Sequence, residues 1–267
     1  MNARFRYSAN ISMLFAELPF LDRIEAAAKA GFPAVECHFP YDLDAGDIHS
    51  RLEDNGLVMN GVNTFAGNLG TFGLAAQPGH ESDFDAAVDQ ALTFCTRVGV
   101  GSIHCMSGTV LPENRVRARQ TFLANMARAS DAARSAGVTL LIEPINRYDR
   151  PGYFVSKSDD VVDLLQELDR DNVKMMFDFY HVQISEGDLL RRMDAHWPYI
   201  GHFQFASVPA RAEPDRGEIA YGAIFSAIAE RGWPGWVAAE YRPRAGTREG
   251  LGWMHTLTPA SVSASCA

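Results

Sequence analysis

The sequence predicts an α/β fold, a single (β/α)8 TIM barrel, and three observations support this prediction. Short runs rich in β-branched and aromatic residues alternate with segments whose apolar residues recur at helical spacing. Eight such runs fit within 267 residues, whereas an open doubly wound sheet more often has about five or six strands. No G-x-G-x-x-G motif follows the first run, as it would in a dinucleotide-binding sheet.

The predicted strands are FRYSANI at 5–11, AVECHF at 34–39, LVMNGVNTF at 57–65, GSIHCMSG at 101–108, VTLLIEPI at 138–145, VKMMFDFY at 173–180, IGHFQFA at 200–206 and GWVAAEY at 235–241. The predicted helices between them include 21–31, 86–100, 117–137 and 159–172. Gly31, Gly137 and Asn172 mark positions where helices are expected to end. Because no linker or fixed-period repeat divides the chain, residues 1–256 are predicted to form one barrel domain. Residues 257–267 are expected to form a flexible tail.

Composition narrows the class of partner. A formal net charge of -9 argues against a non-specific nucleic-acid binder, whose affinity depends on Lys and Arg at phosphates. The four cysteines are scattered without a C-x-x-C pair, which is typical of a reducing compartment. Neither a secretory signal nor an apolar stretch long enough to span a bilayer is recognised. We therefore expect a cytoplasmic protein that acts on a small molecule, without nucleic acid or membrane as partner.

Four oxygen-bearing side chains lie where consecutive predicted strands end. They are Glu143, Asp178, Gln204 and Glu240. The active sites of these barrels form at the carboxyl ends of the strands, so we expect these side chains to converge. Converging carboxylates repel one another unless a cation lies between them, and hard oxygen ligands suit Mg²⁺ or Mn²⁺. The pattern predicts a divalent metal held by all four.

Other polar residues near the strand ends are candidates for substrate contacts. His181 follows Asp178 by three residues, so it is expected to donate a hydrogen bond to a substrate oxygen. Arg211, in the loop after the seventh predicted strand, is a candidate for holding a substrate carboxylate with its planar fork of donors. For Glu36, His38 and His104 we favour structural or pocket-lining roles.

An ordered series of motifs resembles the hydroxypyruvate isomerase family, part of the xylose-isomerase-like barrel superfamily. The motifs are RYSANISMLF, AVECHFPYD, LLIEPINRYDRPGYF, FDFYH, GHFQFASVPARAEPDRGEI and WVAAEYRPR, which extend over residues 5–254. The resemblance implies interconversion of hydroxypyruvate and tartronate semialdehyde through an enediolate, with Glu143 and Glu240 as proton donor and acceptor. It also implies that the residues at the four strand-end positions bind the metal. The reaction is internal, so neither NAD nor a flavin is expected.

The resemblance leaves alternatives open. Ala220 stands where the family often has Asn, and ASVPAR replaces the ADNPHR form of the related hydroxypyruvate isomerases. Many sugar epimerases of this superfamily have His where this chain has Gln204. A 2-oxo-tetronate isomerase is the second hypothesis, although that group usually lacks the EPIN and DxPG pattern. A DNA-cleaving AP endonuclease and a non-catalytic sugar-acid binding barrel are the rivals from other classes. Phe39, Tyr41 and Phe65 are candidates for covering the site or for a homo-oligomer interface.

Overall fold

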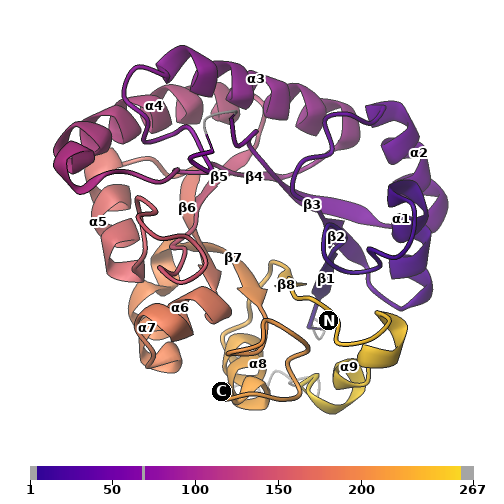
Figure 1. Cartoon of the computed structure of the whole chain (residues 1–267). Coiled ribbons are helices and arrows are strands. Elements are labelled where there is room, and N and C mark those ends of the chain that lie inside the picture. The colour runs from indigo at the N-terminus through magenta and orange to yellow at the C-terminus, as the bar shows by residue number, and fades with distance from the viewer. Residues whose placement is uncertain (1–4, 68–69, 260–267) are drawn as a thin grey trace, which may run out of the picture.

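A computed structural model describes residues 5–67 and 70–259 and confirms the barrel. The described strands are parallel and pair in chain order, and β8 pairs with β1 to close the sheet (Figure 1). The strands are β1 (Tyr7–Asn10), β2 (Ala34–Glu36), β3 (Val58–Asn63), β4 (Ser102–His104), β5 (Thr139–Ile142), β6 (Val173–Asp178), β7 (Ile200–Phe205) and β8 (Val237–Ala239). Each lies within one of the eight predicted runs.

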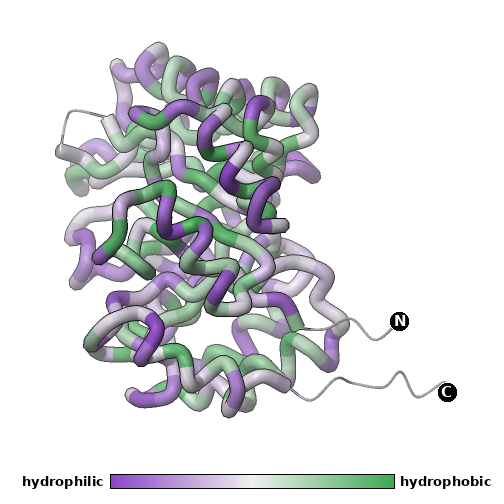
Figure 2. Tube along the Cα trace, turned by 90° about the vertical axis from the view of Figure 1, so that its right-hand side faces the viewer, coloured by the Kyte–Doolittle hydropathy of each residue, from purple (hydrophilic) through white to green (hydrophobic). Residues whose placement is uncertain are grey.

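Helices surround the barrel in a ring (Figure 1). They are α1 (Phe20–Lys29), α2 (Ala45–Asn55), α3 (Glu81–Val98), α4 (Arg115–Ser135), α5 (Ser158–Leu168), α6 (Phe179–Ser185), α7 (Leu189–His196), α8 (Tyr221–Glu230) and α9 (Trp253–Thr256), with short 3-10 turns at η1 (Pro112–Asn114), η2 (Trp197–Tyr199) and η3 (Arg248–Gly250). Hydrophilic and hydrophobic residues alternate along these outer helices, because one side of each packs on the sheet (Figure 2). Among the described residues, no helix has the length and apolar character needed to cross a membrane.

Two of the three predicted helix ends are confirmed. Gly31 and Gly137 follow α1 and α4 with φ of 91° and 68°, which glycine adopts without steric cost. The prediction at Asn172 was wrong, because α5 ends at Leu168 and Asp169 takes the left-handed conformation instead. A short polar side chain tolerates that conformation. The Asn172 amide instead donates to the backbone oxygen of Ser130, 2.9 Å away.

The alternation of side chains along β6 and β7 separates the hydrophobic layer from the barrel interior. Phe203 and Phe205 are fully buried against aromatic rings outside the strands, among them Trp233 and Phe225. Because successive strand residues point to opposite faces, Gln204 points into the barrel. Its amide reaches Glu36 on the opposite side of the barrel, which confirms this direction. The phenylalanines that stabilise the fold thus fix the inward polar residues in place.

The chain end is partly described. Residues 260–267 of the predicted flexible tail lie outside the described residues. Leu257 donates its backbone N–H to Trp253 over 2.8 Å, and the Thr258 hydroxyl lies 3.3 Å from that of Tyr7. The first residues of this segment are therefore hydrogen-bonded to α9 and β1.

Candidate active site and metal centre

A cavity of about 830 Å³ opens at the carboxyl ends of the strands. The four residues predicted to transfer protons or to contact substrate all line it: Glu143, His181, Arg211 and Glu240. Gln204 lines a much smaller cavity, which shares Asn63 and His104 with the large one. The fold therefore brings together side chains that are separated by up to about a hundred residues in the sequence.

Local sequence explains how two carboxylates reach this place. Glu143 directly follows β5, and Pro144 cannot extend the ladder because it has no N–H to donate. Asp178 is the last residue of β6 and also caps α6, since its Oδ1 accepts the backbone N–H of Tyr180 at 2.8 Å. The β6–β7 register pairs Asp178 with Gln204, so these two inward side chains are neighbours.

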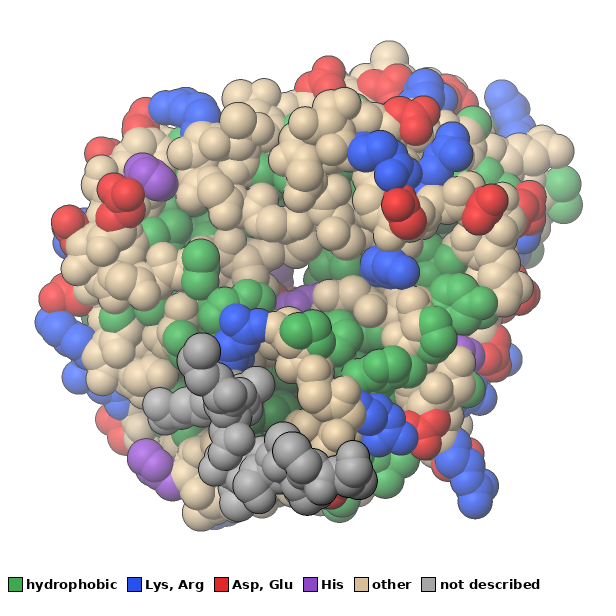
Figure 3. Space-filling model, turned by 180° about the vertical axis from the view of Figure 1, so that it is seen from behind, with side chains coloured by type: hydrophobic (Ala, Val, Ile, Leu, Met, Phe, Trp, Pro, Cys, Tyr) green, Lys and Arg blue, Asp and Glu red, His purple; other side chains and the backbone are tan. Residues whose placement is uncertain are grey.

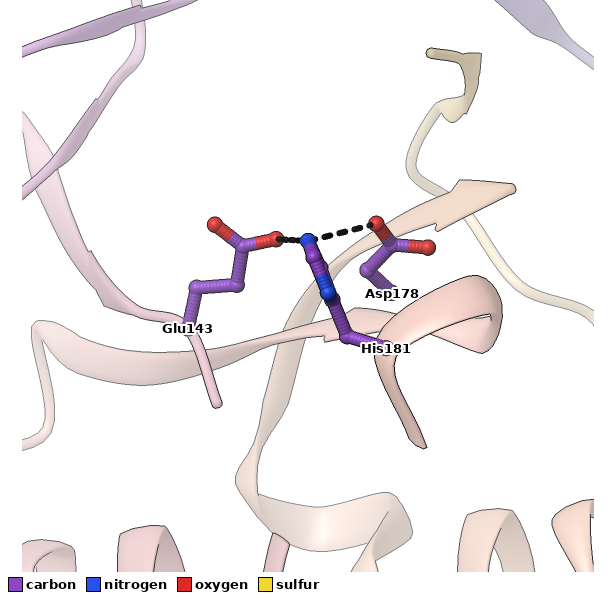
Figure 4. Close-up of side chains that lie close together, drawn as sticks. All are labelled: Glu143, Asp178 and His181. Atoms are coloured by element: carbon purple, nitrogen blue, oxygen red, sulfur yellow. Dashed lines mark ion pairs between the residues drawn. The ribbon is translucent and has the colours of Figure 1, made fainter. Parts of the chain in front are cut away.

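Glu143, Asp178 and His181 form the tightest cluster of metal-ligating groups found in the described part of the chain. The imidazole lies between the two carboxylates, with Nε2 3.6 Å from Glu143 Oε1 and 3.7 Å from Asp178 Oδ2 (Figure 4). One ligand atom from each lies within 4.8 Å of the others. His181, expected to contact substrate, thus lies beside both carboxylates of the predicted metal site.

The proton on His181 is assigned by its neighbours. The backbone N–H of Asn146 points to Nδ1 at 3.3 Å, and its side-chain amide lies 2.7 Å from the same atom. The Asn146 oxygen accepts the N–H groups of Tyr148 and Asp149, so the amide nitrogen is the group that faces the imidazole. Nδ1 is therefore an acceptor, and the proton is on Nε2. Burial, together with the charge of Arg211, lowers the pKa of His181 well below its usual value, so the ring is neutral.

The charges of this cluster are unfavourable without a cation. Burial and the charge of Glu240 raise the pKa of Asp178 to about 7, and burial followed by the same charge raises that of Glu143 well above its usual value. Glu143 Oε1, Asp178 Oδ2 and Gln204 Oε1 are buried and have no hydrogen-bond partner among the described residues. Buried oxygens without donors are costly. These three oxygens fit a divalent cation, which would satisfy all of them at once.

Glu240 lies in the opposite electrostatic environment. Its Oε2 accepts a 2.6 Å hydrogen bond from Arg211, and its Oε1 lies 2.9 Å from His38 Nε2. Asn10 donates to the same Oε1 at 3.2 Å. Although burial would raise the pKa of Glu240, Arg211 and His38 outweigh it and hold the pKa well below the usual range. Glu240 is thus ionised and already held by donors, in contrast to Glu143.

Asp149, in the loop after β5, and Tyr180, in α6, are site residues that the sequence did not single out. Asp149 accepts from Arg211 at 3.2 Å and from the Tyr180 hydroxyl at 3.1 Å. The Arg211 guanidinium also lies over the Tyr180 ring, 4.9 Å from its centroid. Asp149 and Tyr180 fall inside the quoted motifs, but a one-dimensional pattern does not show the direction of a loop side chain. Arg211 itself has a φ of 49°, a left-handed conformation that is uncommon for a long side chain.

Glu36, for which a structural or lining role was predicted, is a buried carboxylate inside the barrel below the cavity. Its oxygens lie 2.8 Å from His202 Nε2 and 2.7 Å from the Gln204 amide nitrogen. Burial would raise the pKa of Glu36, but His202 and the Gln204 hydrogen bond more than compensate and lower it. His104 is neutral, because burial lowers its pKa to about 4, and it lies 3.5 Å from Glu143.

Replacing Asp178 with Asn should stabilise the metal-free protein. A carboxyl whose pKa is about 7 in the folded state, against 3.8 ordinarily, favours folding below about pH 4, and this contribution is lost as the pH rises to 7. Asn keeps the cap on Tyr180 and carries no charge. The free energy of unfolding of D178N should match the wild type near pH 4 and exceed it by on the order of 2–4 kcal/mol near pH 8. Urea titrations in EDTA measure this, and an unchanged difference between the two pH values would contradict it.

Comparisons with known proteins identify the family of the chain. Residues 24–257 match the family described as the xylose isomerase-like TIM barrel. A 2-oxo-tetronate isomerase from Cupriavidus necator is 45% identical over 93% of this chain and 97% of its own. A hydroxypyruvate isomerase from Escherichia coli is 37% identical over 93% of this chain and 98% of its own.

A solved structure is also similar over nearly the whole chain. It is titled AP endonuclease, family 2, from Brucella melitensis, and it is 39% identical with a TM-score of 0.92 over 95% of this chain and 99% of that one. The family match and the isomerases extend over the strand ends that carry the cluster described above. The chain therefore belongs to the xylose isomerase-like TIM barrel family and is an isomerase of the group that includes the 2-oxo-tetronate and hydroxypyruvate isomerases.

Proposed function

We propose that the enzyme moves a carbonyl between C2 and C3 of a small sugar acid through an enediolate, with Glu143 and Glu240 as the proton-transfer pair. The observation that carries this proposal is the contrast between the two glutamates. Both line one cavity, yet the pKa of Glu143 is raised and that of Glu240 is lowered. Two carboxyl groups with opposed pKa shifts in one site are typical of an acid and base pair.

The reaction needs one proton removed from carbon and one returned to its neighbour, while the hydroxyl proton passes from one oxygen of the enediolate to the other. Glu240, held ionised by Arg211, is suited to take the proton from the carbon beside the carbonyl. Glu143, whose protonated form is favoured before metal binds, would ligate the cation through Oε1 and deliver a proton to the former carbonyl carbon from its other oxygen. Each positioned group contributes about 10²- to 10⁴-fold to the rate.

The remaining residues bind and orient the substrate. His181 presents its Nε2 proton to the cavity, where it can donate to a substrate oxygen. Arg211 can exchange its bonds to Asp149 and Glu240 for a bidentate contact with the substrate carboxylate. Glu143, Asp178, Gln204 and Glu240 would hold Mg²⁺ or Mn²⁺, which supplies electrostatic stabilisation of the charge that develops on the substrate oxygens. The apolar Ile145 and Met106 border the cavity and limit its hydration.

Two substrates are candidates, and we place the four-carbon 2-oxo-tetronate before hydroxypyruvate. The relative that is 45% identical is named 2-oxo-tetronate isomerase, and the relative that is 37% identical is named hydroxypyruvate isomerase. The departures at Ala220 and in the ASVPAR segment, which lie in the loop that carries Arg211, weaken the resemblance to hydroxypyruvate isomerases, whereas the EPIN and DxPG pattern favours it. The cavity is large enough for either acid.

The test is an NMR assay of both acids side by side, with Mn²⁺ replaced by Mg²⁺ to avoid line broadening. We expect interconversion of 2- and 3-oxo-tetronate with a kcat/KM at least about tenfold above that for hydroxypyruvate. The reverse order would restore hydroxypyruvate as the substrate. Turnover of neither acid, by a folded and metal-loaded protein, would favour the binding-barrel hypothesis.

A nucleic-acid substrate is less consistent with the surface and the site. The formal net charge of -9 is unfavourable for binding to phosphates. At the end of the barrel seen from behind Figure 1, the described acidic and basic side chains are interspersed (Figure 3). The group of possible metal ligands found among the described residues holds three side chains. A DNA-cleaving enzyme of this fold needs ligands for several metals and a basic face. We therefore propose a small acid rather than DNA as the partner.

Arg211→Lys should raise the KM for the acid by at least about tenfold. An ammonium group cannot reproduce a bidentate contact with a carboxylate, although it keeps the positive charge. The chain offers a matched control in Arg244, which pairs with Glu213 and Asp215 outside the cavity. Arg244→Lys should leave the KM within about twofold. Equal KM values in the Arg211→Lys and wild-type enzymes would mean that Arg211 does not hold the substrate.

A further inference from the structure

The Gln204 side chain can present either an oxygen or an NH₂ group to the metal centre, and only the oxygen is a ligand. One of its polar atoms lies 2.7 Å from Glu36 Oε1 and is the amide nitrogen. The other, Oε1, is buried and has no hydrogen-bond partner among the described residues. A neutral amide can act as a metal ligand here only if this orientation is fixed. The reason for the fixed orientation therefore has to lie on the Glu36 side.

Four donors surround the Glu36 carboxylate. Asn10 Nδ2 lies 3.0 Å from the oxygen that the Gln204 amide reaches, and His202 Nε2 and Asn60 Nδ2 lie 2.8 and 3.3 Å from the other. These donors come from three different strands, β1, β3 and β7, so the carboxylate cannot rotate away from any one of them without breaking several hydrogen bonds. A carboxylate with this many donors is buried at a tolerable cost.

The orientation of Asn10 is fixed independently of Glu36. Asn10 Oδ1 accepts the backbone N–H of Ser12 at 3.1 Å, which leaves Nδ2 to face Glu36. The Ser8 hydroxyl at Asn60 Oδ1 can donate or accept, so Asn60 is oriented by the contact of its Nδ2 with Glu36. The Glu36 oxygen that Gln204 reaches is the one that Asn10 donates to, so it is an acceptor on evidence that does not involve Gln204. Gln204 must turn its NH₂ group toward Glu36.

We propose that Glu36 is a positioning residue that holds the Gln204 amide with its oxygen toward the metal centre. The inference rests on the metal centre of the proposed function and adds the residue that makes an amide usable as one of its ligands. It also explains why a charged residue is retained in the barrel interior, where an apolar side chain would be less costly to bury. Asn10 extends the same arrangement, because its Nδ2 donates to both Glu36 and Glu240.

The test is the affinity for Mn²⁺, measured by calorimetry and by the electron paramagnetic resonance signal of free Mn²⁺, without substrate. In Glu36→Gln, the single amide oxygen should face His202 and Asn60, because Asn10 keeps Glu240 as a second acceptor. The new NH₂ group then faces Gln204, which turns its own oxygen away from the metal. We expect Mn²⁺ affinity to fall by at least about tenfold, as is typical when a partner of a metal ligand is lost.

The double variant Glu36→Gln with Gln204→Glu exchanges the two groups and should restore the affinity to within about threefold of the wild type. The carboxylate introduced by Gln204→Glu can accept from the new amide with one oxygen and offer the other to the metal. Asn60→Ala is the matched control, since it removes a donor to the same carboxylate but does not contact Gln204. Its Mn²⁺ affinity should remain within about threefold of the wild type.

The outcomes separate the two proposals. Unchanged affinity in a folded Glu36→Gln variant, an equal loss in Asn60→Ala, or no recovery in the exchanged variant would each overturn the positioning role while leaving the metal centre intact. If Glu36→Gln does not fold, the double variant Glu36→Gln with Gln204→Glu provides the test. A Mn²⁺ affinity within about threefold of the wild type would support the proposal, and an approximately tenfold loss would overturn it. A wild type that binds no Mn²⁺ at millimolar concentration would overturn the metal centre, and this inference with it.

Discussion

Replacing Glu143 or Glu240 with Gln is expected to lower turnover by at least about a hundredfold while the fold survives. Gln keeps the size and one oxygen of Glu but removes the proton-transfer group. Stability should hold in Glu143→Gln or rise, because Glu143 is buried close to other carboxylates that raise its pKa. In Glu240→Gln the hydrogen bond to Arg211 loses its charged acceptor, so this variant should be somewhat less stable.

Exchange of carbon-bound hydrogen in D₂O distinguishes the two roles. With Glu240 as the base, Glu143→Gln should still exchange the substrate hydrogen without completing isomerisation, and Glu240→Gln should do neither. Glu213→Gln is the matched control, because Glu213 is also buried and bound by an arginine, Arg244, but does not line the cavity. Its turnover should stay within about threefold. Near-normal turnover in both site variants would rule out the two-glutamate mechanism.

Removal of divalent metal is expected to lower turnover by about 10²- to 10³-fold, and addition of Mg²⁺ or Mn²⁺ should restore it. The expectation follows from the three buried oxygens of Glu143, Asp178 and Gln204 that have no donors in the described part of the chain. Stabilisation of developing charge by such a cation contributes several kcal/mol. Dialysis against EDTA followed by stepwise addition of metal measures both the loss and the recovery. Full activity in EDTA, with metal content confirmed as negligible, would contradict the prediction.

A crystal structure with Mn²⁺ checks the ligand set itself. One ion should lie roughly 2.0–2.3 Å from oxygens of Glu143, Asp178, Gln204 and Glu240. Glu240 should bind the ion through Oε2, because this oxygen accepts one hydrogen bond, from Arg211, whereas Oε1 contacts both His38 and Asn10. An ion held by Glu143, Asp178 and His181 without Gln204 would contradict both this ligand set and the proton assigned to His181 Nε2. That result would also remove the basis for the role proposed for Glu36.

The strand-end carboxylates could be predicted because two regularities coincide. The strands and helices alternate regularly along the chain, and all eight strands of the barrel are parallel. Their carboxyl ends therefore lie at the same end of the barrel, whatever the detailed packing. Glu143 directly after β5 and Asp178 at the end of β6 can therefore be identified from the pattern of residues alone. The helix end at Asp169 was missed, because more than one polar residue near it could adopt the left-handed conformation.

The sequence by itself determined the barrel, the rim on which the site lies and the residues that reach it, since these depend on patterns within and between neighbouring segments. Only the tertiary structure decided how those residues are paired. Arg211 holds Glu240 and not Glu143, Asn146 fixes the proton of His181, and Glu36 reaches Gln204 across the barrel. Such pairings join residues 29 to 168 positions apart. They depend on the direction that each loop takes and on which hydrogen-bond donors lie beside which acceptors in the interior. Each unpaired buried polar atom is costly, so all the partners must be satisfied together.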